Sequence, residues 1–212
     1  MEPLNHLHIY AAARLAHGDL FEIDRQLAGG HDLNGQWVLL VKQAFVAVAN
    51  LTDLELTVRR IYKEQPKVSA EYKKWQRQFD FAKYVRNILV GHTNPALIEK
   101  AIEWKPELYS LLGETDENAR LLINVFLLET AINTYVDDDE KHLVFDGDTD
   151  LVYPPDWRRF LGFLGDVVRG GIAFLALLIG VLELPGKPSD AERMRLFKKA
   201  GLTTFKRITR GR

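Results

Sequence analysis

Three polar residues near the middle of the chain, Arg86, Asn87 and His92, are the strongest candidates for chemistry. They close a long amphipathic segment that ends in the residues Arg-Asn-Ile-Leu-Val-Gly-His. Histidine can act as a general base or acid at neutral pH, and arginine binds phosphate through two parallel N–H groups. Asn87 can donate to a phosphate oxygen or orient the histidine. This set suits metal-independent cleavage of RNA, which needs a base, an acid and positive charge beside the phosphorus.

The spacing of Arg86 and His92 places a condition on this chemistry. On one straight helix the two residues would lie about 120° apart around the axis and about 9 Å apart along it. Either Gly91 ends the helix in the left-handed conformation and lets His92 fold back, or two copies of the chain pair so that both sets line one groove. A purely structural interpretation also stands, because the helix dipole favours an arginine near a helix C-terminus.

Other familiar catalytic and metal-binding patterns are missing from the sequence. It has no Walker loop, dinucleotide-binding glycine pattern, HExxH or GxSxG. Asp146, Asp148 and Asp150 imitate the start of a calcium loop, but the glycine and glutamate that should follow are Leu151 and Trp157, so a turn is expected. The absence of cysteine excludes disulfides, thiolate zinc sites and cysteine nucleophiles. We therefore expect neither a metal nor a cofactor.

Helical periodicity dominates the first two-thirds of the chain. Apolar residues recur there every three or four positions, which predicts amphipathic helices that face a common core. The short connections favour antiparallel neighbours, so we predict an all-α antiparallel bundle. Gly18 is expected to end the first helix, and Asn34 and Asn94 to cap later ones. The predicted helices cover residues 3–16, 19–27, 34–61, 69–90, 94–104 and 116–136.

The sequence changes in character after residue 136. Two short apolar runs flank Asp146-Gly147 within 142–153, which predicts a small β-hairpin. A strongly apolar helix is expected over 156–183, followed by a C-terminal helical extension capped by Ser189. We therefore predict a bundle of residues 1–136 and a second region, 137–212, that packs on the bundle or on a partner, since its apolar helix would not be stable in water alone.

Charge is distributed unevenly along the chain. The last twenty residues contain eight basic side chains and no acidic ones. Because the whole chain has a net charge of −1, the other 192 residues carry −9. A basic tail attracts phosphates, and we expect RNA contacts there. The tail residues that we single out for RNA binding are Lys198, Lys199, Lys206 and Arg207.

The sequence favours a cytoplasmic protein over a membrane protein. The N-terminus lacks the basic and apolar segments of a secretory signal. Within the apolar segment 160–184, charged residues leave only 170–182 uncharged. Such a stretch spans about 20 Å as a helix, short of the roughly 30 Å hydrocarbon core of a bilayer. Peripheral membrane association through this helix and the basic tail is a third hypothesis.

The bundle and its motif resemble the HEPN superfamily, whose members are small helical bundles marked by an arginine, four to six residues and a histidine. Arg86 and His92 have five residues between them, and Asn87 matches the polar residue often found after the arginine. The resemblance covers residues 1–136. It implies an endoribonuclease with catalytic residues Arg86, His92 and Asn87, a composite site across a homodimer, and a role in toxin–antitoxin pairs or phage defence beside an antitoxin or regulatory protein. The alternative is a non-catalytic helical module that binds a protein or nucleotide partner.

Overall fold

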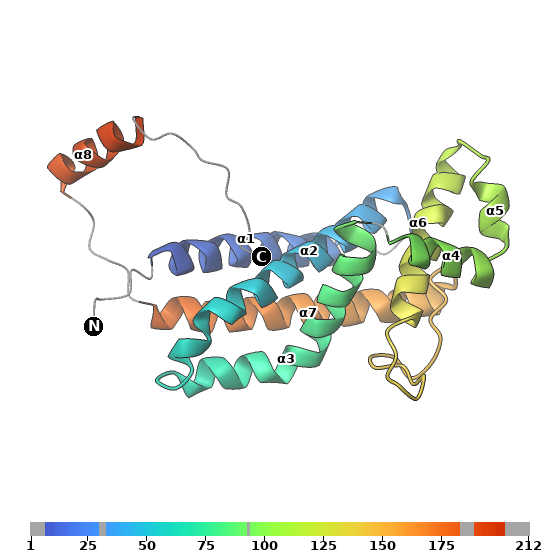
Figure 1. Cartoon of the computed structure of the whole chain (residues 1–212), viewed down its shortest axis with the longest axis horizontal. Coiled ribbons are helices and arrows are strands. Elements are labelled where there is room, and N and C mark those ends of the chain that lie inside the picture. The colour runs from blue at the N-terminus through green and yellow to red at the C-terminus, as the bar shows by residue number, and fades with distance from the viewer. Residues whose placement is uncertain (1–6, 30–32, 93, 183–188, 202–212) are drawn as a thin grey trace. The chain divides into compact units, whose positions relative to one another are not determined.

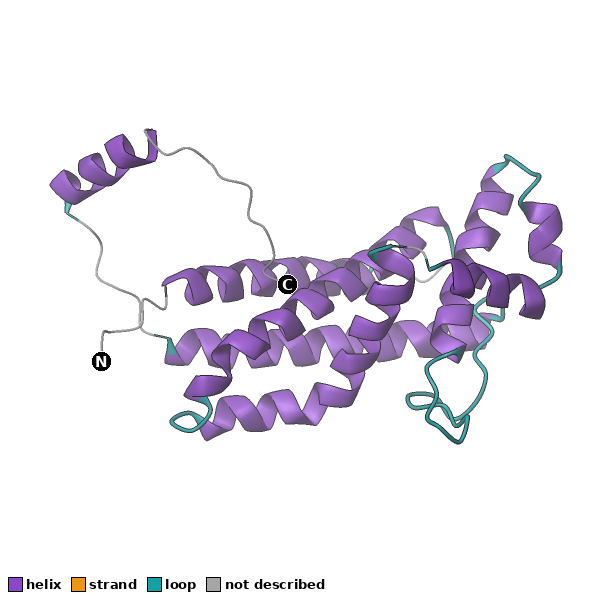
Figure 2. Ribbon diagram, in the orientation of Figure 1, coloured by secondary structure: helices purple, strands orange, loops and turns teal. Residues whose placement is uncertain are grey.

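The computed structural model describes residues 7–29, 33–92, 94–182 and 189–201, and these residues are almost entirely helical (Figures 1 and 2). The all-α prediction is confirmed. The helices, in chain order, are α1 (Leu7–Leu27), α2 (Gly35–Val58), the 3₁₀ turn η1 (Arg59–Ile61), α3 (Pro66–Val85), the π-helical turn η2 (Arg86–Val90), α4 (Pro95–Trp104), α5 (Glu107–Leu111), α6 (Glu117–Asn133), α7 (Pro154–Val181) and α8 (Asp190–Gly201).

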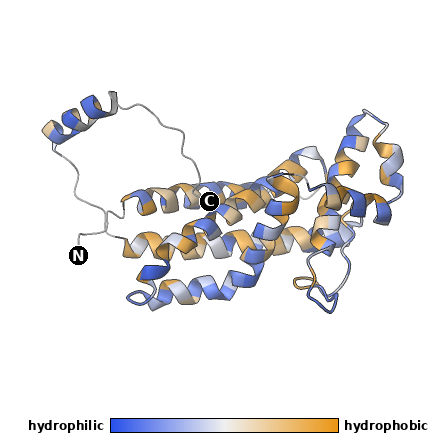
Figure 3. Cartoon of the chain, viewed as in Figure 1, coloured by the Kyte–Doolittle hydropathy of each residue, from blue (hydrophilic) through white to orange (hydrophobic). Residues whose placement is uncertain are grey.

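The core lies between four long helices, α1, α2, α3 and α7, which pack side by side (Figure 1). Each contributes a stripe of apolar residues, and the largest of these side chains are fully buried. Figure 3 shows hydrophobic residues along α2 and α7 and a more hydrophilic α3, whose outer face meets water. Burial of the apolar stripes explains why the 3.6-residue period could be recognised in the sequence. The largest fully buried side chains of these helices include Phe45, Phe79, Phe81, Phe160 and Phe174.

Two adjacent glycines allow α7 to approach its neighbours closely. A Cβ atom on Gly170 would lie 2.5 Å from the ring of Trp75, and one on Gly171 would lie 2.8 Å from Leu20. Glycine inside a helix costs roughly 1 kcal/mol relative to alanine, so these positions need a packing reason. Here the reason is the absence of room for any side chain.

Gly18 lies inside α1, which is one continuous helix. The prediction that Gly18 separates two helices is therefore wrong. A Cβ atom on Gly18 would have no neighbour within 4 Å, so the position faces open space. Apolar burial on both sides of Gly18 outweighs its weak helix propensity, which is a small local effect.

The segment between α6 and α7 contains no β-strand in the residues that the structure describes. It contains an isolated antiparallel bridge between Val136 and His142. The β-hairpin predicted over 142–153 is therefore wrong. Buried side chains of α6 hold the loop instead: Asn133 accepts from Thr149 N–H at 2.9 Å, and Glu129 accepts from Leu151 N–H at 3.0 Å.

The chain divides into two compact units, Met1–Leu182 and Glu183–Arg212. α7, which belongs to the region 137–212 of the sequence analysis, lies in the first unit and packs on α1, α2 and α3. The second unit contains α8. Ser189 and Glu192 bond each other reciprocally at its first turn, Ser189 N–H to the carboxylate at 2.9 Å and Glu192 N–H to the hydroxyl at 3.3 Å. This is a capping box, so the predicted cap at Ser189 is confirmed.

Two helical segments, Gly35–Ile61 and Pro154–Val181, are long and apolar enough to cross a membrane by length and composition alone. Half of the most apolar window of each is buried against other parts of the protein. A core helix of a bundle has the same length and composition, so this observation is weak evidence for a membrane span.

Candidate functional site

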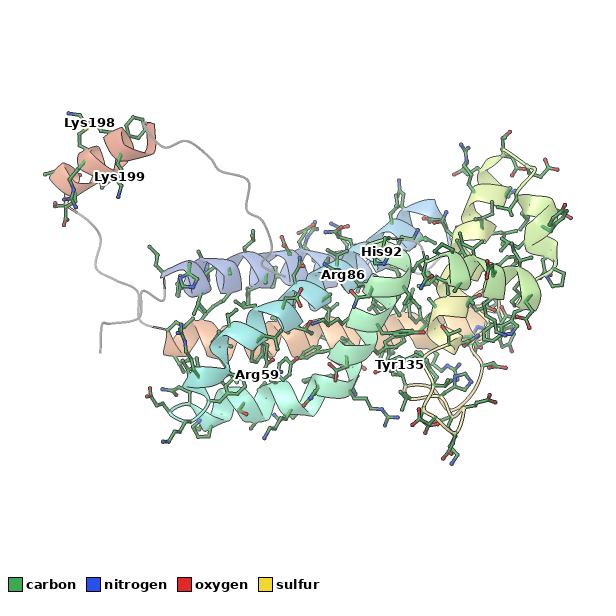
Figure 4. All side chains as sticks on the ribbon, in the orientation of Figure 1. Arg59, Arg86, His92, Tyr135, Lys198 and Lys199 are labelled. Carbon is green, nitrogen blue, oxygen red and sulfur yellow. The ribbon has the colours of Figure 1, made fainter. Side chains whose placement is uncertain are left out.

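The candidate site begins where α3 passes into the π-helical turn η2. Val85 and Leu89 are buried and anchor this end of the helix, and η2 packs against both α2 and α6. The side chain of Arg86 is half-buried, whereas Asn87 and His92 are exposed. Figure 4 shows Arg86 and His92 at the same end of the helix. π-helical turns are rare and frequently occur at functional sites.

Gly91 brings the Arg86 side chain to the turn that carries His92. Gly91 N–H donates to Arg86 O at 2.7 Å. A Cβ atom on Gly91 would lie 3.7 Å from Arg86 Cδ and 3.8 Å from Arg86 Nε. The arginine side chain therefore runs past Gly91, the residue directly before His92.

Gly91 does not have the left-handed conformation that the sequence suggested. Its φ is −73° and its ψ −38°, which are right-handed helical values. That prediction is wrong, because the π-helical turn rather than a left-handed residue ends the helix. A small residue is still required, since a Cβ atom would lie 3.2 Å from Arg86 O.

The connection after η2 is held at both ends. Asn94 N–H donates back to Ile88 O at 2.9 Å, and the Asn94 side chain accepts from Ala96 N–H at 3.0 Å. Asn94 therefore caps α4 as predicted, with Pro95 in the first turn. His92 lies within this short connection, and Thr93 is outside the described residues.

The local electrostatics leave positive charge available. Arg86 Nη1 donates to Asn87 Oδ1 at 2.9 Å, so the two predicted partners are in direct contact. Within the described part of the chain no carboxylate forms an ion pair with Arg86. Apart from the bond to Asn87, no hydrogen bond joins the Arg86 guanidinium to another side chain of the described residues. No hydrogen bond joins His92 to Arg86 or Asn87 among the described contacts, so one copy of the chain brings the three residues to one turn without linking all of them.

The basic residues predicted to bind RNA lie in the second unit or beyond the description. Lys198 and Lys199 occupy the exposed last turn of α8. Lys206 and Arg207 lie outside the described residues. Among residues that the structure does describe, no group of three or more histidine, aspartate or glutamate side chains is arranged to hold a metal ion.

Sequence reasoning missed two other polar positions. Lys42 of α2 is half-buried and donates to Asn124 of α6 at 2.5 Å. Glu129 of α6 is 3% exposed and pairs with Lys105 at 2.7 Å. The available signal for Lys42 was one charged residue within the mainly apolar stretch 37–49. Its partner is 82 positions away, and no local pattern indicates it.

Comparisons with known proteins give no further support for a family. No protein-family model, no curated protein and no solved structure matches this chain.

Proposed function

We propose that this protein is a metal-independent endoribonuclease of HEPN type that acts through Arg86 and His92. The observation that carries the proposal is the π-helical turn in which the Arg86 side chain lies beside Gly91, the residue before His92, while no described carboxylate pairs with it. Asn87 orients the guanidinium by accepting from Arg86 Nη1.

The reaction that fits these groups is internal transesterification of RNA. A base removes the proton from a 2′-hydroxyl, the 2′-oxygen attacks the adjacent phosphorus, and the bond to the 5′-oxygen breaks as an acid protonates it. The products are a 2′,3′-cyclic phosphate and a 5′-hydroxyl. His92 serves as base or acid, and Arg86 stabilises the charge that develops on the phosphorane oxygens.

Two proton-transfer groups are needed, and one copy of this motif supplies one histidine. We therefore propose a homodimer in which His92 of each protomer lines a shared groove. A biological role as a toxin or phage-defence effector in the cytoplasm, held in check by an antitoxin or regulatory protein, follows from the same resemblance.

The test is incubation of the purified protein with total RNA in EDTA, comparing the wild type with His92→Ala and Arg86→Ala. Each variant should lose about 10²- to 10⁴-fold in cleavage rate, the usual contribution of general acid–base or electrostatic catalysis. His8→Ala and Arg77→Ala, two exposed positions on α1 and α3, serve as controls with wild-type activity. Equal cleavage by all five proteins would place the activity elsewhere or in a contaminant. No cleavage by a wild-type dimer free of bound inhibitor would count against the nuclease.

A second candidate, a module that binds a protein partner, is favoured by exposed apolar residues on α4 and α5 and just after α5. Trp104, Tyr109 and Leu112 are 42%, 77% and 53% exposed. Exposed aromatic and aliphatic side chains close together in the chain are typical of protein contacts. If this module is the whole function, Tyr109→Ala should abolish the cellular phenotype while Arg86→Ala and His92→Ala leave it unchanged.

A further inference from the structure

A cavity of about 400 Å³ lies between the first turns of α2 and α6. Its walls include Val38, Leu39 and Leu121, which give it an apolar surface, and Gln36, Arg120 and Asn124, which give it polar groups. Leu39 is 68% exposed although it is a leucine on a core helix. An apolar cavity with a few convergent polar groups is the usual form of a small-ligand site.

The charge beside this cavity is positive and incompletely compensated. Lys42 Nζ donates to the Asn124 side chain, which in turn donates to Arg120 O at 2.8 Å. Burial lowers the pKa of Lys42, and within the described residues its ammonium pairs with no carboxylate. Arg120 is exposed at the cavity wall. Together these groups favour an anion such as a phosphate.

One acidic group, Glu117, also lines the cavity and is exposed. A carboxylate would oppose a bare phosphate but accepts hydrogen bonds from ribose hydroxyls or from an amino group of a base. Apolar walls, two cations and one acceptor therefore match a nucleotide better than they match inorganic phosphate.

The cavity and the candidate cleavage site lie along the same stripe of α2. The ion pair between Lys83 and Asp53, at 2.8 Å, sets the register of α3 against α2. Asp53, Lys42 and Leu39 fall within about 60° of one another around α2. η2 packs on α2 and α6, the two helices that form the cavity (Figures 1 and 4).

The axial distance between the two places is short. From the Lys83–Asp53 pair, α2 runs back fourteen residues to Leu39, and the antiparallel α3–η2 segment runs forward nine residues to His92. At 1.5 Å per residue these are about 21 Å and about 13 Å, so the two levels differ by about 8 Å. The two places therefore lie at neighbouring levels along the axis of α2.

We propose that this cavity is a nucleotide subsite, which holds the nucleotide of an RNA strand next to the one cleaved at Arg86 and His92. The proposal rests on the ribonuclease function above. Lys42 and Arg120 attract the backbone phosphate, the apolar walls receive the base, and Glu117 accepts from the ribose or base.

The first experiment measures binding without cleavage. The full chain carrying His92→Ala is titrated against a fluorescein-labelled hexanucleotide with 2′-O-methyl groups, with and without Arg120→Glu. The expected result is at least a tenfold loss of affinity. Lys67→Glu is the matched control, since it makes the same change in charge at an exposed position on the first turn of α3, far outside the Debye length. Equal affinity for the Arg120→Glu and Lys67→Glu proteins would overturn the proposal.

The second experiment locates the ligand. Amide ¹H–¹⁵N shifts are followed during titration with the same hexanucleotide, with nucleoside 5′-monophosphates and with inorganic phosphate. Shifts at Gly35 and Leu121 with the hexanucleotide support the subsite. Shifts with a monophosphate alone would overturn its role on an RNA strand, and shifts confined to other residues would overturn the site. Because neither experiment needs catalysis, absence of cleavage by the wild type would contradict the ribonuclease function separately.

Discussion

The charged groups buried on α6 and α2 differ in their partners: some form ion pairs, and one bonds an amide. Glu129 and Glu55 are 3% and 2% exposed, and each has a cationic partner: Lys105 at 2.7 Å and Arg59 at 2.9 Å. Lys42 of α2 is half-buried, yet within the described residues its ammonium donates to an amide oxygen, that of Asn124 of α6. Among the described residues, the side-chain hydrogen bond of Arg86 likewise goes to an amide, that of Asn87.

This difference separates stability from ligand binding. Each of these buried carboxylates has a cation and a second donor, the Leu151 N–H for Glu129 and the Tyr62 hydroxyl for Glu55, so each is satisfied within the folded chain. A cation that meets only an amide oxygen keeps most of its charge uncompensated. In this protein Lys42 lies on α2 and bonds Asn124 of the cavity wall, and Arg86 lies in η2, which packs on α2 and α6. The structure thus retains positive charge where our proposals place RNA.

The largest expected effect is on stability, from Glu129→Ala. The change removes the partner of Lys105 and the acceptor of the buried Leu151 N–H. We expect a loss of about 3 kcal/mol in the free energy of unfolding and a fall of roughly 6–12 °C in Tm. Urea unfolding and calorimetry measure these changes. Glu103→Ala, which removes an exposed pair with Lys100, should lower stability by about 0.5 kcal/mol or less. A similar loss of unfolding free energy in the two variants would contradict the claim that the buried pair stabilises the protein more than the exposed pair.

The second prediction concerns Gly91→Ala and tests the position of Arg86. The new methyl group would lie 3.2 Å from Arg86 O, so the turn that carries Arg86 must shift by a few tenths of an ångström. We expect cleavage to fall about tenfold, since small displacements of a catalytic group reduce the rate strongly. Stability should change by about 1 kcal/mol or less, because the helix propensity of alanine offsets the crowding.

Gly18→Ala is the control for that experiment. Its methyl group would face open space in the middle of α1. This variant should be up to about 1 kcal/mol more stable with unchanged cleavage. Wild-type activity in Gly91→Ala would mean that the packing of Arg86 on Gly91 does not position a catalytic group.

Most of the helices could be predicted from the sequence, because their apolar stripes are buried and burial imposes the 3.6-residue period. Two caps, Asn34 and Asn94, were also predictable and are confirmed, since a cap bonds a backbone N–H only two or three residues away. The wrong prediction of a β-hairpin over 142–153 has a different cause. The loop before α7 is held by two long-range hydrogen bonds, in which backbone N–H groups 16 and 22 residues further along donate to Asn133 and Glu129. Such contacts overrode the local alternation that favoured a hairpin.

The residues of the candidate site could be predicted from the sequence, but their geometry could not. Arg86, Asn87 and His92 are close in the chain, so their presence at one turn could be expected from spacing. The π-helical turn could not, because it depends on how Leu89 and Val85 are packed by α2 and α6. The cavity could not be predicted from the sequence for a related reason. Its wall residues Val38 and Leu121 are 83 positions apart in the chain, and the packing of α2 on α6 brings them together.

The smallest expected effect is that of Lys42→Met, and it has opposite signs for stability and binding. Burial lowers the pKa of Lys42. The unfolded chain therefore binds this proton more tightly than the folded one. Lys42 opposes folding below its folded pKa, and this opposition decreases as the pH rises toward the value of unfolded lysine, about 10.4. Lys42→Met should accordingly gain about 1 kcal/mol or less at pH 7, and the gain should shrink toward pH 10.

Urea unfolding of the wild type and Lys42→Met at pH 7 and pH 10 measures this difference, with Lys67→Met as the same substitution at an exposed position. The same variant should bind the 2′-O-methyl hexanucleotide more weakly, since a phosphate would lose one of its cations. A gain in stability together with a loss of binding would show that the chain keeps this half-buried charge for a ligand. A loss of stability at both pH values would instead show that the bond to Asn124 holds α2 and α6 together, and would place Lys42 with Glu55 and Glu129 among the satisfied groups.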